Sequence, residues 1–176
     1  MIHLLTIHES DIYPKKEDLN PQNFKLRHAA RAVVLNAAGE VALLKATAHN
    51  YHKLPGGGVE EGEDMKLALQ RELLEEIGCR ASITSEIGEI IEYRDKWNMK
   101  QISHCYLAEQ VGEQQPPAFT QSEIDEGFEV FWASDIEVAI QLLQQDMPEN
   151  YDGSFIQLRD SELLRAARQK MRSADN

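Results

Sequence analysis

The chain has 176 residues, a length that suits one domain with a continuous hydrophobic core. It carries 18 lysines and arginines against 30 aspartates and glutamates, which gives a formal net charge of −12. This balance argues against a nucleic-acid polymer as partner, because contacts to a phosphate backbone need a basic surface. It does not exclude a small phosphorylated molecule, since divalent cations can invert the local sign of an acidic site.

No part of the chain has the pattern of a membrane span or a targeting segment. The apolar runs fall well short of the roughly 20 residues that cross a bilayer. The apolar start, residues 1–7, is too short for a signal peptide and has no basic region before it. Cys79 and Cys105 form no CxxC pair and are interpreted as small buried residues. We therefore expect no membrane partner and a cytoplasmic location.

Periodicity and turn residues predict strands and helices on both sides of one glycine-rich stretch. Before it we expect a strand at 1–8, a loop at 9–23, a strand at 27–36, a second strand paired with it at 40–46, and a polar loop at 47–53. After it we expect a helix at 65–77 ended by Gly78, strands at 80–94 and 99–109, a loop at 110–121, a strand at 128–133, a helix from the N-cap Ser134 to Gln145, and a last helix at 160–171. This order predicts an α/β or α+β domain around a mixed sheet.

The predicted helix at 65–77 carries three carboxylates on one face. Glu72, Glu75 and Glu76 stand at i, i+3 and i+4, whereas Leu69 and Leu73 lie on another arc that can pack on a sheet. Like charges at this spacing repel each other, and the C-terminal end of a helix disfavours anions. A bound hard cation such as Mg²⁺ would relieve this repulsion. A solvated acidic face is the alternative, and the helix spacing alone favours it.

Three successive glycines, Gly56, Gly57 and Gly58, precede this helix. They permit positive φ angles and a close approach of the backbone to a ligand, and the following helix N-terminus favours anions. No Lys-Ser or Lys-Thr pair follows them, so the loop is not a P-loop. A glycine run alone indicates no more than a turn.

Loop and helix together match one longer pattern, G-x5-E-x7-R-E-U-x-E-E-x-G-U, in which U is a bulky aliphatic residue. The match runs from Gly57 to Cys79, and Cys79 at the last aliphatic position is its one departure. The chain therefore resembles the Nudix hydrolases, of the MutT-like single-domain kind. The resemblance covers residues 25–146, with 1–24 as an N-terminal strand and arm and 147–176 as a helical extension of the same domain. It implies an α/β/α sandwich with a central mixed sheet.

The resemblance also implies roles for the residues of the matched segment. Mg²⁺, with Mn²⁺ as a substitute, is expected to bind the carboxylates of Glu72, Glu75 and Glu76 and the backbone carbonyl of Gly56. Arg71 is expected to hold Glu72 in place by a salt bridge. Glu63 is expected to anchor the loop or to bind metal through water.

The resemblance also implies a general base outside this segment, for which the acidic loop at 122–127 is the candidate. Glu126 is our choice, with Glu123 and Asp125 as alternatives, and a merely solvated loop accounts for each of them equally well.

The substrate is expected to contact residues on both sides of the matched segment. We expect these contacts from Gly57, His52, Tyr93, Arg94 and Trp97, the last three lying near a hairpin tip that could stack a base and hold a phosphate. The tip could equally be a capped hairpin end or a contact in a homodimer. The expected reaction is hydrolysis of a diphosphate linkage in a nucleoside triphosphate or a related small nucleoside diphosphate derivative. The alternatives are a nucleotide sugar or dinucleotide as substrate, or a non-catalytic module that senses a nucleotide.

Overall fold

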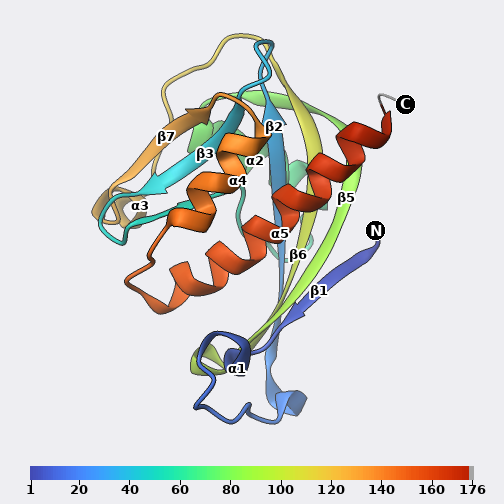
Figure 1. Cartoon of the computed structure of the whole chain (residues 1–176). Helices are drawn as coiled ribbons and strands as arrows, with labels where there is room; N and C mark the ends of the chain where they lie inside the picture. The colour runs from blue at the N-terminus through green and yellow to red at the C-terminus, as the bar shows by residue number, and fades with distance from the viewer. Residues whose placement is uncertain (175–176) are drawn as a thin grey trace.

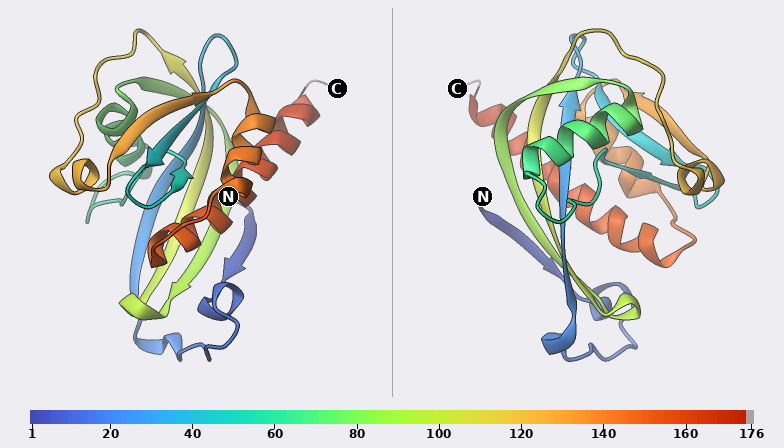
Figure 2. Two further views of the ribbon diagram at one scale, coloured as in Figure 1. Left: turned by 60° about the vertical axis from the view of Figure 1, so that its left-hand side comes forward. Right: turned by 180° about the vertical axis from the view of Figure 1, so that it is seen from behind.

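The computed structural model describes residues 1–174 and contains a seven-stranded mixed sheet between two layers of helices (Figure 1). The strands are β1 (His3–Ile7), β2 (Lys25–Leu35), β3 (Val41–Ala46), β4 (Tyr51–Lys53), β5 (Arg80–Arg94), β6 (Met99–Val111) and β7 (Phe128–Ala133). Helix α2 (Met65–Ile77) covers one face, and α4 (Ile136–Gln145) and α5 (Tyr151–Ala174) cover the other (Figure 2). The α/β/α sandwich is thereby confirmed.

Short helical segments occupy several connections. They are α1 (Glu9–Ile12), η1 (Pro21–Asn23), η2 (Asp95–Trp97) and α3 (Gln121–Asp125), of which α1, η1 and α3 fall inside stretches predicted as loops. Within residues 1–174, the structure has no helix with the length and apolarity needed to cross a membrane.

The sheet has the strand order β1-β5-β6-β2-β3-β4, with β7 added beside β3. The long hairpin of β5 and β6 is antiparallel. Strand β6 runs parallel to β2 over the whole length of β2, from Lys25 opposite Met99 to Leu35 opposite Glu109. Strand β1 pairs in parallel with β5 at the edge. The mixture of parallel and antiparallel neighbours agrees with the sequence prediction.

The core lies in two layers, because successive strand residues point to opposite faces of the sheet. On β2, Ala32 and Val34 face α2 and pack with Leu69 and Leu73. Val33 faces the other way and belongs to the layer under α4 and α5. Helix α5 therefore forms part of the same hydrophobic body as the sheet.

The glycine-rich loop runs along the edge of β2 that β3 leaves open. Ala30 N donates to Gly57 O (2.9 Å), Ala32 N donates to Pro55 O (3.1 Å), and Val59 N donates to His28 O (2.9 Å). The loop is thus held like an added strand, which fixes its position relative to the sheet.

The strand partners around β3 differ from the prediction. Strand β3 pairs with β7 over its whole length and meets β2 only where Val41 lies opposite Leu35. Residues 51–53 form strand β4 rather than a loop, because they pair with the other edge of β3. Local turn signals predict that strands exist, but they do not identify partners that are distant in the sequence.

The helix predictions hold with two corrections. Helix α2 has the predicted bounds and ends at Gly78, whose φ of 64° is left-handed. Helix α4 is capped by Asp135 instead of Ser134, since the Asp135 side chain accepts from Val138 N. Helix α5 begins at Tyr151, well before the predicted residue 160, where Asn150 accepts from Gly153 N.

Candidate functional site

Helix α2 begins and ends with well-defined caps. The Asp64 side chain accepts from the backbone N–H groups of Lys66 and Leu67, and Gly78 ends the helix. Leu69 and Leu73 are buried against the sheet, so the helix is fixed about its axis. In this orientation the three glutamates lie on the side of α2 that faces the glycine-rich loop and the solvent.

Arg71 is the centre of an ion-pair cluster on this side of α2. Its guanidinium donates to Glu63 through Nε and Nη2 (3.1 Å each), to Glu72 (2.8 Å) and to Glu75 (3.4 Å) through Nη1. Nη2 also donates to the Gly58 carbonyl (3.1 Å). The hydrogen bonds to Glu63 and then to Glu72 outweigh partial burial and raise the pKa of Arg71. The expected Arg71–Glu72 ion pair is therefore present, and Glu63 ties the loop to the helix.

Glu76 differs from its neighbours because it is buried. Glu76 is 2% exposed, whereas the Glu75 side chain is 44% exposed. The two Glu76 carboxylate oxygens accept from Lys53 Nζ (2.6 Å) and from Gly56 N (2.6 Å). Burial raises the pKa of Glu76, and the charge of Lys53 opposes this rise. The helix spacing did not predict this ion pair, because Lys53 lies on β4.

Gly56 and Gly57 allow the glycine-rich loop to lie close to strand β2 and helix α2. Gly56 has a φ of 123°, and a Cβ there would overlap the Ala30 carbonyl of β2. A Cβ at Gly57 would overlap the Glu72 carboxylate. A side chain at Gly56 would require the β2 backbone to move, and one at Gly57 would require the Glu72 carboxylate to move, so the loop backbone and Glu72 border the same space.

The donors around this space suit a hard divalent cation. Glu72, Glu75, Glu76 and the Gly56 carbonyl offer only oxygen atoms, which Mg²⁺ and Mn²⁺ prefer. Within residues 1–174, no three side chains are already gathered as a metal cluster. A carboxylate oxygen has two lone pairs, so Glu76 can contact an ion while it still accepts from Lys53 or Gly56. The residues present therefore fit the metal that the resemblance implied.

A cavity of about 260 Å³ adjoins this space on the α5 side of the sheet. Lys53, which binds Glu76, belongs to both regions. The cavity is bordered by residues of β2, β4–β7, α3, α5 and the α3–β7 turn: Arg27, Arg31, Tyr51, Lys53, Arg94, Gln101, Glu123, Glu126, Phe128, Asp152, Ile156 and Arg159. Two predicted site residues, Arg94 and Glu126, are among them.

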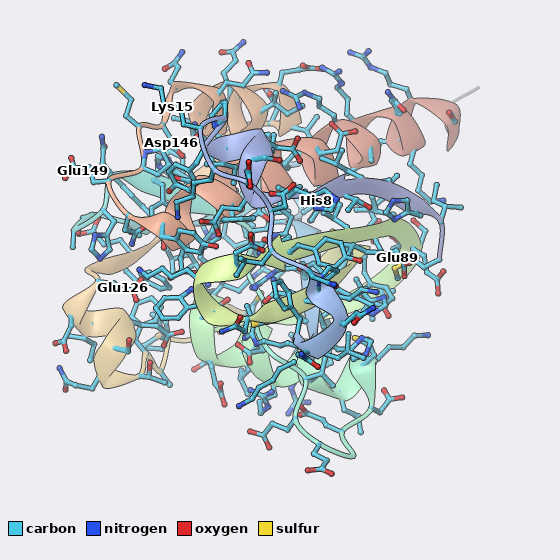
Figure 3. All side chains as sticks on the ribbon, turned by 90° about the horizontal axis from the view of Figure 1, so that it is seen from below. His8, Lys15, Glu89, Glu126, Asp146 and Glu149 are labelled. Atoms are coloured by element: carbon cyan, nitrogen blue, oxygen red, sulfur yellow. The ribbon has the colours of Figure 1, made fainter. Side chains whose placement is uncertain are left out.

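Three other predicted substrate contacts, Tyr93, His52 and Trp97, are not among the residues that border the cavity. Tyr93 points to the opposite face of β5 from Arg94, and its ring stacks on His8 at 4.9 Å between centroids. Figure 3 shows His8 well away from Glu126. His52 is buried, is bonded to Asp146 through its backbone N–H and Nδ1, and is not among the residues that border the cavity, so its contact with the substrate stays a prediction. Trp97 is 48% exposed, and its Nε1 donates to Asp152 (3.3 Å) at the cavity rim.

Behind the cavity lies a buried ionic network that the sequence analysis missed. Glu92 accepts from Arg94 (2.7 Å), Arg159 (3.4 Å) and Gln101 (2.6 Å), and Arg159 also donates to Asp160 (2.7 Å). Burial acts to raise the pKa of Glu92, but the charges of Arg159 and Arg94 prevail and lower it to about 2. The network holds Arg94 and Arg159 at the cavity wall. No signal in the sequence indicated this network, because β5 carries other polar residues such as Glu86 and Glu89 beside Glu92.

Comparison with known protein families agrees with the matched pattern. The family model described as the NUDIX domain matches residues 25–152. The MutT protein from Methanosarcina mazei Go1 has a similar structure, with a TM-score of 0.57 and 20% sequence identity over 84% of this chain and 96% of that one. At this identity the similarity establishes the fold.

Two relatives match shorter segments. A Bacillus subtilis (strain 168) protein described as a "Putative 8-oxo-dGTP diphosphatase" is 39% identical over 59 residues, 34% of this chain and 40% of that protein. An RNA pyrophosphohydrolase of Actinobacillus pleuropneumoniae serotype 5b (strain L20) is 44% identical over 46 residues, 26% of this chain and 22% of the relative. The chain thus matches less than half the length of either relative.

Proposed function

Since this chain belongs to the Nudix family, we propose that it hydrolyses a diphosphate linkage in a small nucleotide-like substrate with the help of Mg²⁺, for which Mn²⁺ can substitute. The observation that carries this proposal is the complete acidic set of Glu72, Glu75 and Glu76 beside a cavity rich in cationic side chains. A purely sensory module needs no intact set of metal-binding carboxylates, so the enzyme is favoured over it.

The metal would be held by these three carboxylates together with the Gly56 carbonyl. When bound, it neutralises diphosphate oxygens and lowers the pKa of a bound water. Arg71 keeps the Glu72 carboxylate in position through their ion pair, and its bonds to Glu63 hold the loop against the helix. Lys53 balances the buried charge of Glu76.

Glu126 is the proposed general base. It lies at the C-terminal cap of α3 and borders the cavity. Glu123 also borders the cavity, but its carboxylate accepts from the Thr120 N–H (2.7 Å) and hydroxyl (2.8 Å). Asp125 accepts from Gln121 (2.8 Å). These local bonds favour Glu126 among the three acids.

The proposed substrate is a nucleoside triphosphate or a related small nucleoside diphosphate derivative. The modified nucleoside triphosphate in the description of the Bacillus subtilis relative supports this choice. The acidic charge of −12 argues against an RNA chain, although the second relative is described as an RNA pyrophosphohydrolase. A nucleotide sugar or a dinucleotide is the alternative.

A hydrolysis panel tests this function. The purified chain is incubated with nucleoside triphosphates, nucleotide sugars, dinucleotides and a 5′-triphosphorylated RNA oligonucleotide, each with Mg²⁺, Mn²⁺ or excess EDTA. We expect metal-dependent release of a nucleoside monophosphate from a small substrate. Cleavage of the RNA alone would reject the small-substrate assignment, and turnover of nothing in the panel would favour the sensory module.

A further inference from the structure

The cavity beside the proposed metal site has the opposite charge balance to the whole protein. Five basic side chains border it, Arg27, Arg31, Lys53, Arg94 and Arg159, against three acidic ones, Glu123, Glu126 and Asp152. The whole chain has a net charge of −12. Such a local excess of cations is the arrangement that proteins use to bind phosphate groups.

Most of these cations already have partners. Arg94 donates to Glu92 and Asp152, Arg159 donates to Asp160 and Glu92, and Lys53 donates to Glu76. Their charges are therefore largely balanced inside the protein. They shape the cavity wall more than they attract a ligand.

Arg31 is different. It is 6% exposed, and its Nε and Nη1 atoms have no hydrogen-bond partner among the residues that the structure describes. Arg31 projects from β2 on the same face as Val33, toward the α5 layer, and borders the cavity. Burial lowers the pKa of Arg31 to about 10, which still leaves the guanidinium charged at neutral pH. An unpaired buried charge is unfavourable, so a ligand that completes its bonding is the simplest reason for it.

We propose that Arg31 binds a phosphomonoester group of the substrate, separate from the diphosphate that is cleaved. This assignment rests on the hydrolase function proposed above and narrows its substrate class. A phosphomonoester carries a charge of about −1.5 to −2 at pH 7 and offers three acceptor oxygens. It therefore matches Arg31 together with Arg27, the two basic side chains of the cavity that form no ion pair among residues 1–174, better than a carboxylate does. Among residues 1–174, Arg31 forms no ion pair with Glu72, Glu75 or Glu76, so its guanidinium is not paired with the carboxylates proposed to hold the metal.

The first experiment measures binding without turnover. Inorganic phosphate is titrated into the full chain in excess EDTA, and the shift in Tm is recorded for wild type, Arg31→Met and Arg80→Met. Arg80 is an exposed residue at the start of β5, so its variant controls for the loss of one positive charge. We expect Arg31→Met to weaken phosphate binding at least about tenfold, because a hydrogen bond to a charged group is lost. Arg80→Met should behave as wild type.

The unliganded variants give an independent readout. Arg31→Met should be at least as stable as wild type, since it removes an unpaired buried charge. If it does not fold, Arg31→Lys keeps the charge and removes the guanidinium geometry, and it should also weaken phosphate binding. Undiminished phosphate binding by the folded variant, or equal stabilisation of wild type by acetate, would overturn the proposal.

The second experiment compares substrates that differ by one phosphomonoester. Wild type and Arg31→Met are assayed with NADP⁺ against NAD⁺, and with coenzyme A against its 3′-dephospho form. Wild type should prefer the phosphorylated member of at least one pair in kcat/KM, and the variant should lose that preference while it keeps activity on the other member. Equal losses on both members would show that Arg31 serves the shared diphosphate, which would overturn the proposal. Arg31-dependent phosphate binding without hydrolysis of any compound would instead reject the hydrolase function and leave the anion site standing.

Discussion

The molecule contains two clusters of arginine and carboxylate groups that look alike in composition and differ in construction. Arg71 lies on the surface of α2 and binds Glu63, Glu72 and Glu75, all within one continuous loop and helix. Arg159 is fully buried and binds Asp160 beside it and Glu92 on a distant strand. The Arg71 and Glu75 side chains of the first cluster are 31% and 44% exposed, whereas the Arg159 and Glu92 side chains of the second are fully buried. We infer that the first serves chemistry and the second supports the wall of the cavity.

The largest effect is expected when a carboxylate of helix α2 that would hold the metal is removed. Glu75→Gln and Glu76→Gln should each lower kcat by about two orders of magnitude or more, because each removes a carboxylate that would hold the metal. Steady-state kinetics with Mg²⁺ measures this effect. Full activity in excess EDTA would falsify the metal assignment.

Glu75→Gln and Glu76→Gln should also differ in thermal stability. Glu75 is largely exposed, so Glu75→Gln should leave Tm close to that of wild type. Glu76→Gln removes the charge opposite the buried Lys53, so it should also lower Tm. Equal Tm values for the two variants would show that the Lys53 pair contributes little to the fold.

The next prediction concerns the second cluster and the stability of the fold. Glu92→Gln leaves Arg159 and Arg94 with one acidic partner fewer in a buried site, so the free energy of unfolding should fall by about 3–5 kcal/mol. Urea unfolding followed by circular dichroism measures this loss. Arg80→Met, which removes an exposed charge, is the matched control.

The pH dependence of stability gives a second readout for Glu92. Its pKa falls from 4.5 to about 2 in the folded chain, so the folded state binds this proton less readily than the unfolded state. The stabilisation is therefore complete above about pH 4.5 and is lost as the pH falls toward 2. Glu92→Gln should flatten this acid slope. An unchanged slope would mean that other carboxylates dominate acid unfolding.

The same contrast explains what the sequence could predict. Arg71 and its partners lie close together in the sequence, so residue spacing alone predicts the cluster. The bounds of α2 follow from the same local pattern. Glu92 and Arg159 meet only because β5 and α5 pack together. No local pattern contains that information.

The substrate residues show the same limit at a finer scale. Strand alternation predicts that Tyr93 and Arg94 face opposite sides of β5, but it does not say which side holds the cavity. His52 bonds to Asp146, which follows α4, and this contact depends on the packing of α4 beside β4. The unpartnered state of Arg31 is likewise visible only when every neighbour is placed.

A smaller effect is expected from Arg71→Ala. The change frees the Glu72 carboxylate without removing a metal ligand, so kcat should fall about tenfold to a hundredfold while metal affinity falls less. Kinetics at varied Mg²⁺ separates the two quantities. Turnover equal to that of wild type would show that Glu72 needs no positioning by Arg71.

The smallest effect concerns the hairpin tip and compares Trp97 with Tyr93. The Trp97 ring is hydrogen-bonded to Asp152, which borders the cavity, whereas Tyr93 stacks on His8 on the other face of β5. A base stacked on Trp97 would contribute roughly 1–3 kcal/mol, so Trp97→Ala should raise KM about tenfold with kcat nearly unchanged. Tyr93→Ala should leave KM unchanged, provided that its Tm shows an intact fold. If Tyr93→Ala raises KM and Trp97→Ala does not, the substrate lies on the face of the sheet that α2 covers, and the cavity beside Arg31 is not where it binds.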